Sequence, residues 1–270
     1  MLHLHPTIRW EGAQSASLPD DPITPEAPLA IRLLTGTRTA RQSQELAVTM
    51  RTPGADEDLV RGYLFAEGII HKNADILQIR CPSAAQVEVV LAPEVVFTAA
   101  QHARYGVTSS SCGLCGKSTL EQIDHLSCYY PVPNHPVVAA STLYQLPAKL
   151  QQQQSLFSQT GGIHAAALFS ASGDLLLIRE DVGRHNALDK LVGAALLQGT
   201  LPWRECILLV SGRLSYELVQ KAAMAGTPLL AAIGAPSSLA IELAEQSGLT
   251  LVGFLRSNRL NCYTFPARIR

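Results

Sequence analysis

Apolar runs separated by turn-forming residues divide the first half of the chain into short elements. Residues 28–35 and 44–52 are rich in apolar and β-branched residues and predict strands, the second of which ends at Pro53 and Gly54. Residues 56–68 carry acids in their first turn, one apolar face and a final glycine, and therefore predict a helix. Residues 76–81 and 86–92 predict a hairpin. We expect this half to be mixed α+β.

The second half alternates more regularly between segments with the helical spacing of apolar residues and segments typical of strands. A helix is expected from about 141 to 154, followed by a strand hairpin at 162–170 and 175–180. Helices are then predicted at 187–197, 216–226 and 237–248, and strands at 206–211, 228–234 and 249–256. This order predicts a central mixed sheet flanked by helices, which is an α/β layered domain.

Three segments lack such periodicity. Residues 1–26 are polar and contain proline, so a loose, flexible arm is expected at 1–27. Residues 102–118 are dense in Ser and Gly and predict a mobile loop, and the prolines at 129–137 predict a linker. The predicted organisation is an arm, a smaller α+β domain at 28–138 that ends in this loop and linker, and a layered domain at 139–270.

Composition excludes several classes of protein. Hydrophobic residues make up 47% and charged residues 16% of the 270 residues, which excludes a disordered chain. The net charge of -1 argues against a nucleic-acid-coating protein. No apolar run approaches the roughly 18 residues of a membrane span, and the first residues do not resemble a secretory signal. We therefore expect a cytoplasmic protein with neither nucleic acid nor membrane as partner. Six cysteines are too few for a disulfide scaffold.

The strongest chemical signal is the pair Cys112 and Cys115, which lies among Ser and Gly with Lys117 nearby. Buried structural cysteines normally have apolar neighbours, and a nearby ammonium favours the nucleophilic thiolate. Four interpretations remain. The first is a zinc site, which would need two more ligands in a matching pattern. The second is a thioredoxin-type redox pair, which would need a strand and a helix around it. The third is a purely structural role. The fourth is a sulfur relay, in which one thiolate carries a persulfide and the other helps to release it.

Two further signals lie between predicted strands and helices. Arg184 and His185 open one helix, and the segment of Ser211 and Arg213 precedes another. Helix N-termini bind anions, and ligands in α/β sheets lie at the carboxyl ends of strands. Ser237 repeats this arrangement one unit later. With the C-terminal arginines, these loops predict a site for one polyanionic ligand.

The simpler interpretations of these residues are structural. His185 is more commonly a structural histidine than a catalyst, and Asp181 is expected to cap the next helix or to pair with Arg184. Ser215 and Ser237 are typical helix caps. The four arginines from 254 to 270, with no acid between them, are either a solvated basic end or part of an anion site.

Several motifs together resemble one family. SSCGLCGK, TGGIHAAALF, REDVGRHNALDKLVG, SGRLSYELVQKAAMAG, APSSLAIELA and LTLVGFLRSNRLNCYT occur in this order and are similar to those of the formate dehydrogenase accessory sulfurtransferase family, FdhD. The resemblance covers about 28 to 265 and leaves the N-terminal arm outside.

The resemblance implies a function. Family members are sulfurtransferases that carry sulfur from a cysteine desulfurase to the bis-(molybdopterin guanine dinucleotide) form of the molybdenum cofactor, which formate dehydrogenase then uses. It implies that Cys112 holds the persulfide and that Cys115 is its partner. It also implies a cytidine-deaminase-like C-terminal domain, a homodimer, and no resident metal. The implied cofactor-binding stretch consists of Phe254, Leu255, Arg256, Ser257, Asn258 and Arg259.

Rival functions make different demands on the residues. A zinc deaminase needs H-x-E and P-C-x-x-C at two helix starts, but His185 has no Glu two residues later and the 212–215 segment has no cysteine. A non-catalytic cofactor chaperone would need the arginines and neither cysteine. A metal-binding structural protein is a third alternative.

The remaining four cysteines are expected to be inert, with Cys206 the most buried of them. They are Cys81, Cys128, Cys206 and Cys262.

Overall fold

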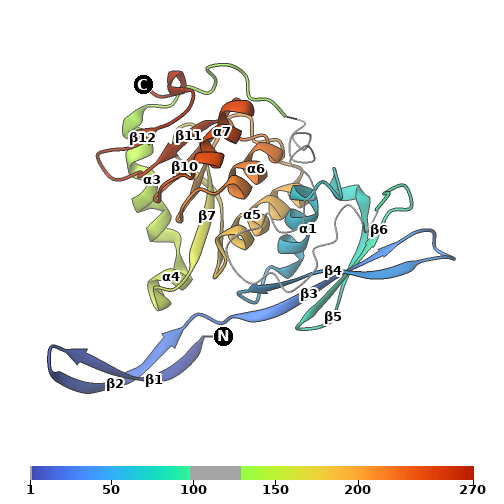
Figure 1. Ribbon diagram of the computed structural model, residues 1–270, viewed down its shortest axis with the longest axis horizontal. Coiled ribbons are helices and arrows are strands. Elements are labelled where there is room, and N and C mark those ends of the chain that lie inside the picture. Colours follow the sequence, from blue (N-terminus) through green and yellow to red (C-terminus); the bar gives the residue numbers. More distant parts are fainter. Residues whose placement is uncertain (1, 98–128) are drawn as a thin grey trace.

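The computed structural model describes residues 2–97 and 129–270. Within these residues the strands form a two-stranded, a four-stranded and a six-stranded sheet. Figure 1 shows the six-stranded sheet and its helices as one body, with the four-stranded sheet beside it and the two-stranded sheet projecting away. No helix in these residues is long and apolar enough to cross a membrane.

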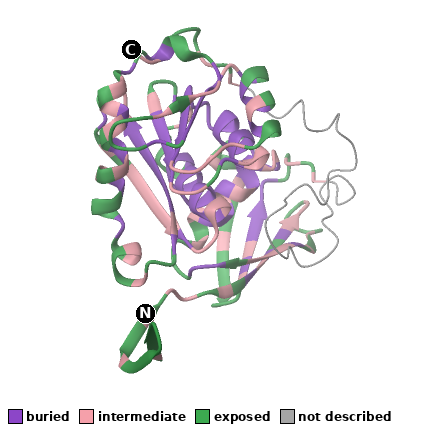
Figure 2. Cartoon of the chain, turned by 60° about the vertical axis from the view of Figure 1, so that its left-hand side comes forward, coloured by how far each residue is buried: buried purple, intermediate pink, exposed green. Residues whose placement is uncertain are grey.

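The first residues form an antiparallel hairpin of β1 (His3–Glu11) and β2 (Gln14–Ile23), so the expectation of a segment without regular structure is wrong. Even positions of β1 carry Leu4, Ile8 and Trp10 and odd positions are mostly polar, which is the period of a strand. Proline at position 6 interrupts this alternation and hides it in the sequence. Both faces of the hairpin are exposed (Figure 2).

The four-stranded sheet has the order β4-β3-β6-β5. Its strands are β3 (Ala27–Thr35), β4 (Gln42–Arg51), β5 (Ile76–Ser83) and β6 (Gln86–Leu91). β3 pairs antiparallel with β4 and parallel with β6, and helix α1 (Asp56–Ala66) connects β4 to the short 3-10 turn η1 (Asn73–Asp75) before β5. These elements agree with the predicted strands, helix and hairpin of the first half.

The six-stranded sheet has the order β12-β11-β10-β9-β7-β8. Its strands are β7 (His164–Ser170), β8 (Leu175–Asp181), β9 (Cys206–Val210), β10 (Leu229–Ala232), β11 (Thr250–Gly253) and β12 (Asn261–Cys262). β9, β10 and β11 run parallel, whereas β7, β8 and β12 pair antiparallel with their neighbours. The predicted mixed sheet is confirmed, although β11 ends at Gly253 and β12 was not expected.

Helices cover both faces of this sheet. Alternate residues of β9 divide between two hydrophobic clusters: Leu208 belongs to one with α5 (Arg184–Gln198), α6 (Tyr216–Met224) and α7 (Ser238–Gln246), and Leu209 belongs to the other with α3 (Ala140–Gln153). The short helix α4 (Ser155–Thr160) follows α3, and a 3-10 turn η3 (Pro266–Arg268) lies near the C-terminus. The predicted α/β layers are therefore present.

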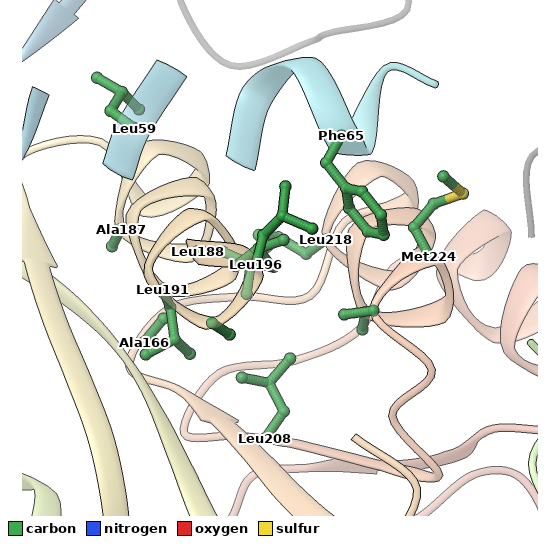
Figure 3. Close-up of a cluster of buried hydrophobic side chains, with 14 of the residues drawn as sticks. Leu59, Phe65, Ala166, Ala187, Leu188, Leu191, Leu196, Leu208, Leu218 and Met224 are labelled. Atoms are coloured by element: carbon green, nitrogen blue, oxygen red, sulfur yellow. The ribbon is translucent and has the colours of Figure 1, made fainter. Parts of the chain in front are cut away.

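The two halves share one hydrophobic core. A cluster of buried residues runs from the four-stranded sheet through α1 to α5, α6 and the six-stranded sheet (Figure 3). Helices α1 and α5 cross closely, because a Cβ atom at Gly62 would overlap the carbonyl oxygen of Asp189 and one at Gly193 would overlap that of Asp58. α5 is buried along residues 186–196, which is typical of a helix enclosed on all sides.

Candidate functional site

The loops at one edge of the six-stranded sheet form the candidate site. β9, β10 and β11 are parallel, so the segments after them meet at their carboxyl ends, and β7 begins at the same edge because it is antiparallel to β9. Ser211 and Arg213 follow β9, Ser237 follows β10, and the 254–259 stretch follows β11. The predicted convergence of these loops is therefore observed.

Glycines allow the loops to lie directly against one another. A Cβ atom at Gly234 would lie 2.7 Å from the Gly212 oxygen and 2.8 Å from the Arg213 Cα, distances that no side chain tolerates. The Gly234 amide donates to the Gly212 oxygen at 3.0 Å, and the Phe254 amide donates to the Gly234 oxygen at 3.0 Å. The three loops are thus one backbone-bonded unit, which holds the side chains that project from it.

Two helices begin at this edge without a side-chain cap. α5 follows Gly183, which has no side chain, and α6 follows Ser215, whose hydroxyl does not bond to the helix. Uncapped helix N-termini present backbone N–H groups that favour anions. Ser237 differs, because its hydroxyl accepts the Ala240 amide at 3.3 Å and so caps α7 as predicted.

His185 is held between the first turns of α5 and α6. Its Nε2 atom lies 3.0 Å from Glu217 Oε2 and 3.1 Å from Ser215 Oγ. The side chains of His185 and Glu217 are 25% and 19% exposed, so the pair is only partly screened by water. His185 is predicted from the sequence as a site residue but Glu217 is not, because the two are distant in the chain. Only the common position of both residues at helix starts could have indicated the pair.

A second histidine, His164, begins β7 at the same edge of the sheet. Its Nδ1 atom lies 3.4 Å from the Ser211 hydroxyl, which also accepts the Ala165 amide at 2.9 Å. Burial lowers the pKa of His164, and the nearby Arg184 guanidinium lowers it further. The imidazole is therefore biased toward its neutral form. His164 is not among the site residues that the sequence predicts.

Three arginines occupy the edge in different ways. Arg213 and Arg259 are exposed and have no side-chain partner among the described residues. The Nε atom of Arg184 is buried without a hydrogen-bond partner there, and its Cδ atom lies next to Gly212. Their guanidinium groups are suited to bind phosphate or carboxylate oxygens.

The stretch from Phe254 to Arg259 has a divided role. Leu255 is fully buried in the core, so only its backbone can face a ligand. The Arg256 guanidinium donates to the backbone oxygens of Ile233 at 2.7 Å and Leu255 at 2.8 Å, which ties the stretch to the loop after β10. Phe254, Ser257, Asn258 and Arg259 are exposed at the site.

The hypothesis that all C-terminal arginines form an anion site is wrong for Arg268. This residue is 2% exposed and donates to the backbone oxygens of Val132, His135 and Gly248 and to the Thr250 hydroxyl. These hydrogen bonds join the C-terminal segment to the linker and to the beginning of β11. Arg268 is therefore a structural residue.

Asp181 is also structural, but neither expected contact is observed: α5 has no side-chain cap, and the ion pair of Asp181 is with Lys190. Asp181 lies 2.7 Å from Lys190 Nζ and accepts the backbone amides of Thr52 at 3.1 Å and Gly183 at 2.8 Å.

A cavity of about 290 Å³ next to Lys190 separates α4 from the 52–55 turn. The charged groups at this cavity are engaged with protein partners, so the arginine edge is the better candidate for an anionic ligand.

Cys112 and Cys115 lie outside the described residues, as does Cys128. Among the cysteines that the structure describes, Cys81 is exposed and Cys206 and Cys262 are half-buried. Burial raises the pKa of all three thiols, which disfavours the thiolate. In the described parts of the chain no group of three His, Cys, Asp or Glu could hold a metal ion.

The fold and the candidate site together define a class: a layered α/β protein with exposed arginines and two uncapped helix N-termini at one edge of its larger sheet. Residues 26–270 match the FdhD/NarQ family, and the chain belongs to that family.

Curated relatives agree along most of the chain. It is 49% identical over 233 residues to the "Sulfur carrier protein FdhD" of Mycolicibacterium paratuberculosis, covering 83% of this chain and 86% of the relative. It is 43% identical to the protein of the same name from Mycobacterium tuberculosis, with 98% of each chain covered.

Solved structures support the fold. A putative formate dehydrogenase accessory protein from Desulfotalea psychrophila matches 100% of this chain and 99% of its own, with a TM-score of 0.76 and 24% identity. A guanine deaminase from Nitrosomonas europaea matches 57% of this chain at a TM-score of 0.30, which is too low to support an argument. The deaminase-like character of the second half therefore stays a prediction.

Proposed function

We propose that this protein is a sulfur carrier that passes persulfide sulfur from a cysteine desulfurase to the bis-(molybdopterin guanine dinucleotide) molybdenum cofactor, as a step in the maturation of formate dehydrogenase. The single observation that supports it best is the sheet edge with two uncapped helix N-termini and the exposed Arg213 and Arg259. Such an edge suits the phosphates of a dinucleotide cofactor. Relatives named as sulfur carriers support the transfer itself.

The cofactor is the substrate of the proposed reaction. Its phosphates would be held by Arg213 and Arg259. Arg256 would act indirectly, by keeping the 254–259 stretch bonded to the loop after β10. The backbone hydrogen bonds among the three loops mean that the arginines project from one connected unit.

The sulfur chemistry is assigned to the two cysteines. The Cys112 thiolate takes a sulfane sulfur from the persulfide of the desulfurase. The Cys115 thiolate then attacks Cys112, a disulfide forms between them, and the terminal sulfur leaves as hydrosulfide. The two electrons that reduce the sulfane sulfur come from the two cysteines, so the step is balanced. A cellular dithiol reductant of the thioredoxin class would restore both thiols.

Intact mass spectrometry tests the carrier role. The reduced protein is incubated with a cysteine desulfurase and cysteine, and the same is done with Cys112→Ala and with Cys81→Ala. We expect the wild type and Cys81→Ala to gain sulfur that a reductant removes, and Cys112→Ala to gain none. Cys81 is a suitable control because it is exposed and lies in β5. Equal gain in all three proteins would contradict the assignment.

The alternative is a cofactor chaperone that binds and delivers the cofactor without sulfur chemistry. The same arginine edge favours this function, because it needs neither cysteine. The double variant Cys112→Ala, Cys115→Ala separates the two functions in a deletion strain. Restored formate dehydrogenase activity would support the chaperone, and loss of activity with retained nucleotide binding would support the carrier.

A further inference from the structure

The His185 and Glu217 pair lies at the edge where the cofactor is proposed to bind. His185 is the second residue of α5, and Glu217 is in the first turn of α6. Glu217 Oε2 and Ser215 Oγ both lie within 3.1 Å of the same ring nitrogen. A carboxylate at this distance orients the ring and favours the imidazolium form. The pair thus has the geometry of a carboxylate-oriented acid.

A merely structural role explains less of this arrangement. Ser215 occupies the N-cap position of α6 yet does not cap it, since its hydroxyl lies against the imidazole instead. Capping is worth about 1 kcal/mol, so turning the hydroxyl away from the helix forgoes a stabilising contact. Two side chains at the start of α6 are therefore both placed on His185.

Other charged and titratable groups lie at the same edge of the sheet. Among the described residues, the charged and titratable groups near this corner include Glu217 from α6, Arg184 from α5, His164 from β7 and Asp181 from β8. His164 is biased toward the neutral form by burial and by Arg184, whereas His185 adjoins a carboxylate.

The ligand can reach this corner from the arginines. Strands in a sheet lie about 4.8 Å apart, so the loop after β11 is roughly 10 Å from the loop after β9, where Gly212 adjoins the Arg184 side chain. A pterin joined to a nucleoside through a pyrophosphate is longer than this. With its phosphates on Arg213 and Arg259, the rest of such a molecule would be long enough to extend toward α5.

If sulfur delivery replaces an oxo ligand of the cofactor's metal, the exchange would consume a proton. In M=O + HS⁻ + H⁺ → M=S + H₂O the oxo ligand would leave as water and no oxidation state would change. We propose that the protonated His185, oriented at Nε2 by Glu217, supplies this proton from Nδ1 and is then reprotonated from solvent. This inference rests on the proposed function. His185 is then a catalytic residue and Glu217 a positioning residue.

The test compares His185→Gln and Glu217→Gln with a matched control. His135 forms an exposed pair with Glu205 at 3.3 Å, so His135→Gln removes the same kind of contact far from the sheet edge. Three quantities are measured for each protein: sulfur gained at Cys112, equilibrium binding of GDP, and the rate at which loaded protein activates cofactor-containing but sulfur-free formate dehydrogenase. The rate is taken between about pH 5.5 and 8.5, the range in which imidazoles titrate.

We expect His185→Gln to load sulfur and bind GDP as the wild type does, while the activation rate falls about 100-fold, the loss typical of a missing general acid. The wild-type rate should fall as pH rises and the imidazolium deprotonates, and this dependence should be absent in His185→Gln. Glu217→Gln should move the fall in rate to lower pH, because the neutral amide no longer favours the imidazolium. His135→Gln should match the wild type throughout.

Other outcomes would overturn the proposal. An unchanged rate and pH profile in His185→Gln would show that no proton comes from this residue. A loss of GDP binding would assign the pair to ligand binding, and a loss of loading would assign it to the encounter with the desulfurase. Failure of the proposed function is distinguishable, because wild type would then gain no sulfur at Cys112 or Cys112→Ala would activate the enzyme normally.

Discussion

Gly62 of α1 and Gly193 of α5 lie against each other's helix backbone, and this contact joins the two halves of the protein. The Cβ position of Gly193 lies 2.7 Å from the Gly62 amide nitrogen. Because neither residue has a side chain, the helices approach until their backbones touch. The first turn of α5, which carries Arg184 and His185, is therefore placed by a helix from the other half.

Replacing either glycine by alanine should destabilise the fold. The added methyl group would overlap a backbone carbonyl that cannot move without separating the helices. We expect Gly193→Ala to lower the free energy of unfolding by about 3 kcal/mol, at the upper end of the usual cost of overpacking. Urea denaturation measures this change. The control is Gly162→Ala, whose methyl group would meet only ordinary contacts, and an equal loss in both variants would refute the explanation.

The buried pair of Asp181 and Lys190 should be strongly coupled. Asp181 is fully buried and Lys190 is 2% exposed. Lys190→Met should lower the free energy of unfolding by about 3 to 5 kcal/mol, because it leaves a buried carboxylate without its cation. The double variant Asp181→Asn, Lys190→Met should lose less than the sum of the single changes. Additive losses in a double-mutant cycle would contradict this prediction.

Acid should destabilise the protein partly through His164. Its pKa is lowered in the folded state by burial first and by Arg184 second. The unfolded chain therefore binds more protons at this residue, and stability falls as pH decreases from the unfolded value of 6.5 through the lowered folded value. We expect His164→Asn to lose less stability than the wild type between pH 7.5 and 5.5. The free energies of unfolding at these two values measure the effect, and an equal loss would count against it.

The exposed arginines should determine the affinity for a guanine nucleotide. Arg213→Ala and Arg259→Ala should each weaken GDP binding about tenfold, since a hydrogen bond to a charged group contributes about 1.5 to 3 kcal/mol. Raising the salt concentration should weaken wild-type binding more than that of the variants. Isothermal titration calorimetry gives these affinities. Arg204→Ala is the control, because Arg204 is exposed just before β9, at the opposite end of that strand. If all three variants bound equally, the arginine edge would not be the nucleotide site.

Arg256 should act on the fold of its loop rather than on the ligand directly. Arg256→Ala removes two hydrogen bonds to the backbone oxygens of Ile233 and Leu255. We expect faster amide hydrogen exchange at 254–259, with the exchange of β9 unchanged. Arg259→Ala provides the contrast, since its side chain has no partner in the described residues and its removal should leave exchange unaltered. Unchanged exchange in both variants would show that Arg256 does not hold the stretch.

The sequence by itself determined the local elements and the motifs. Apolar spacing of two or about 3.6 residues is a property of neighbouring positions, so the strands β3 to β6 and the helices α1, α3, α5, α6 and α7 could be predicted. The loops after β9, β10 and β11 could be grouped, because parallel strands have their carboxyl ends on one edge. The β1–β2 hairpin was missed because Pro6 breaks an otherwise regular alternation.

Only the tertiary structure decided which of the predicted residues are available to a ligand. Arg259 and Arg268 look alike in sequence, but one is exposed and the other is buried among backbone oxygens. His185 and Glu217 are 32 residues apart and meet because their helices begin at the same edge. Such contacts depend on how helices pack across the sheet, and packing is set by side chains and glycines far away in the chain, such as Gly62 and Gly193.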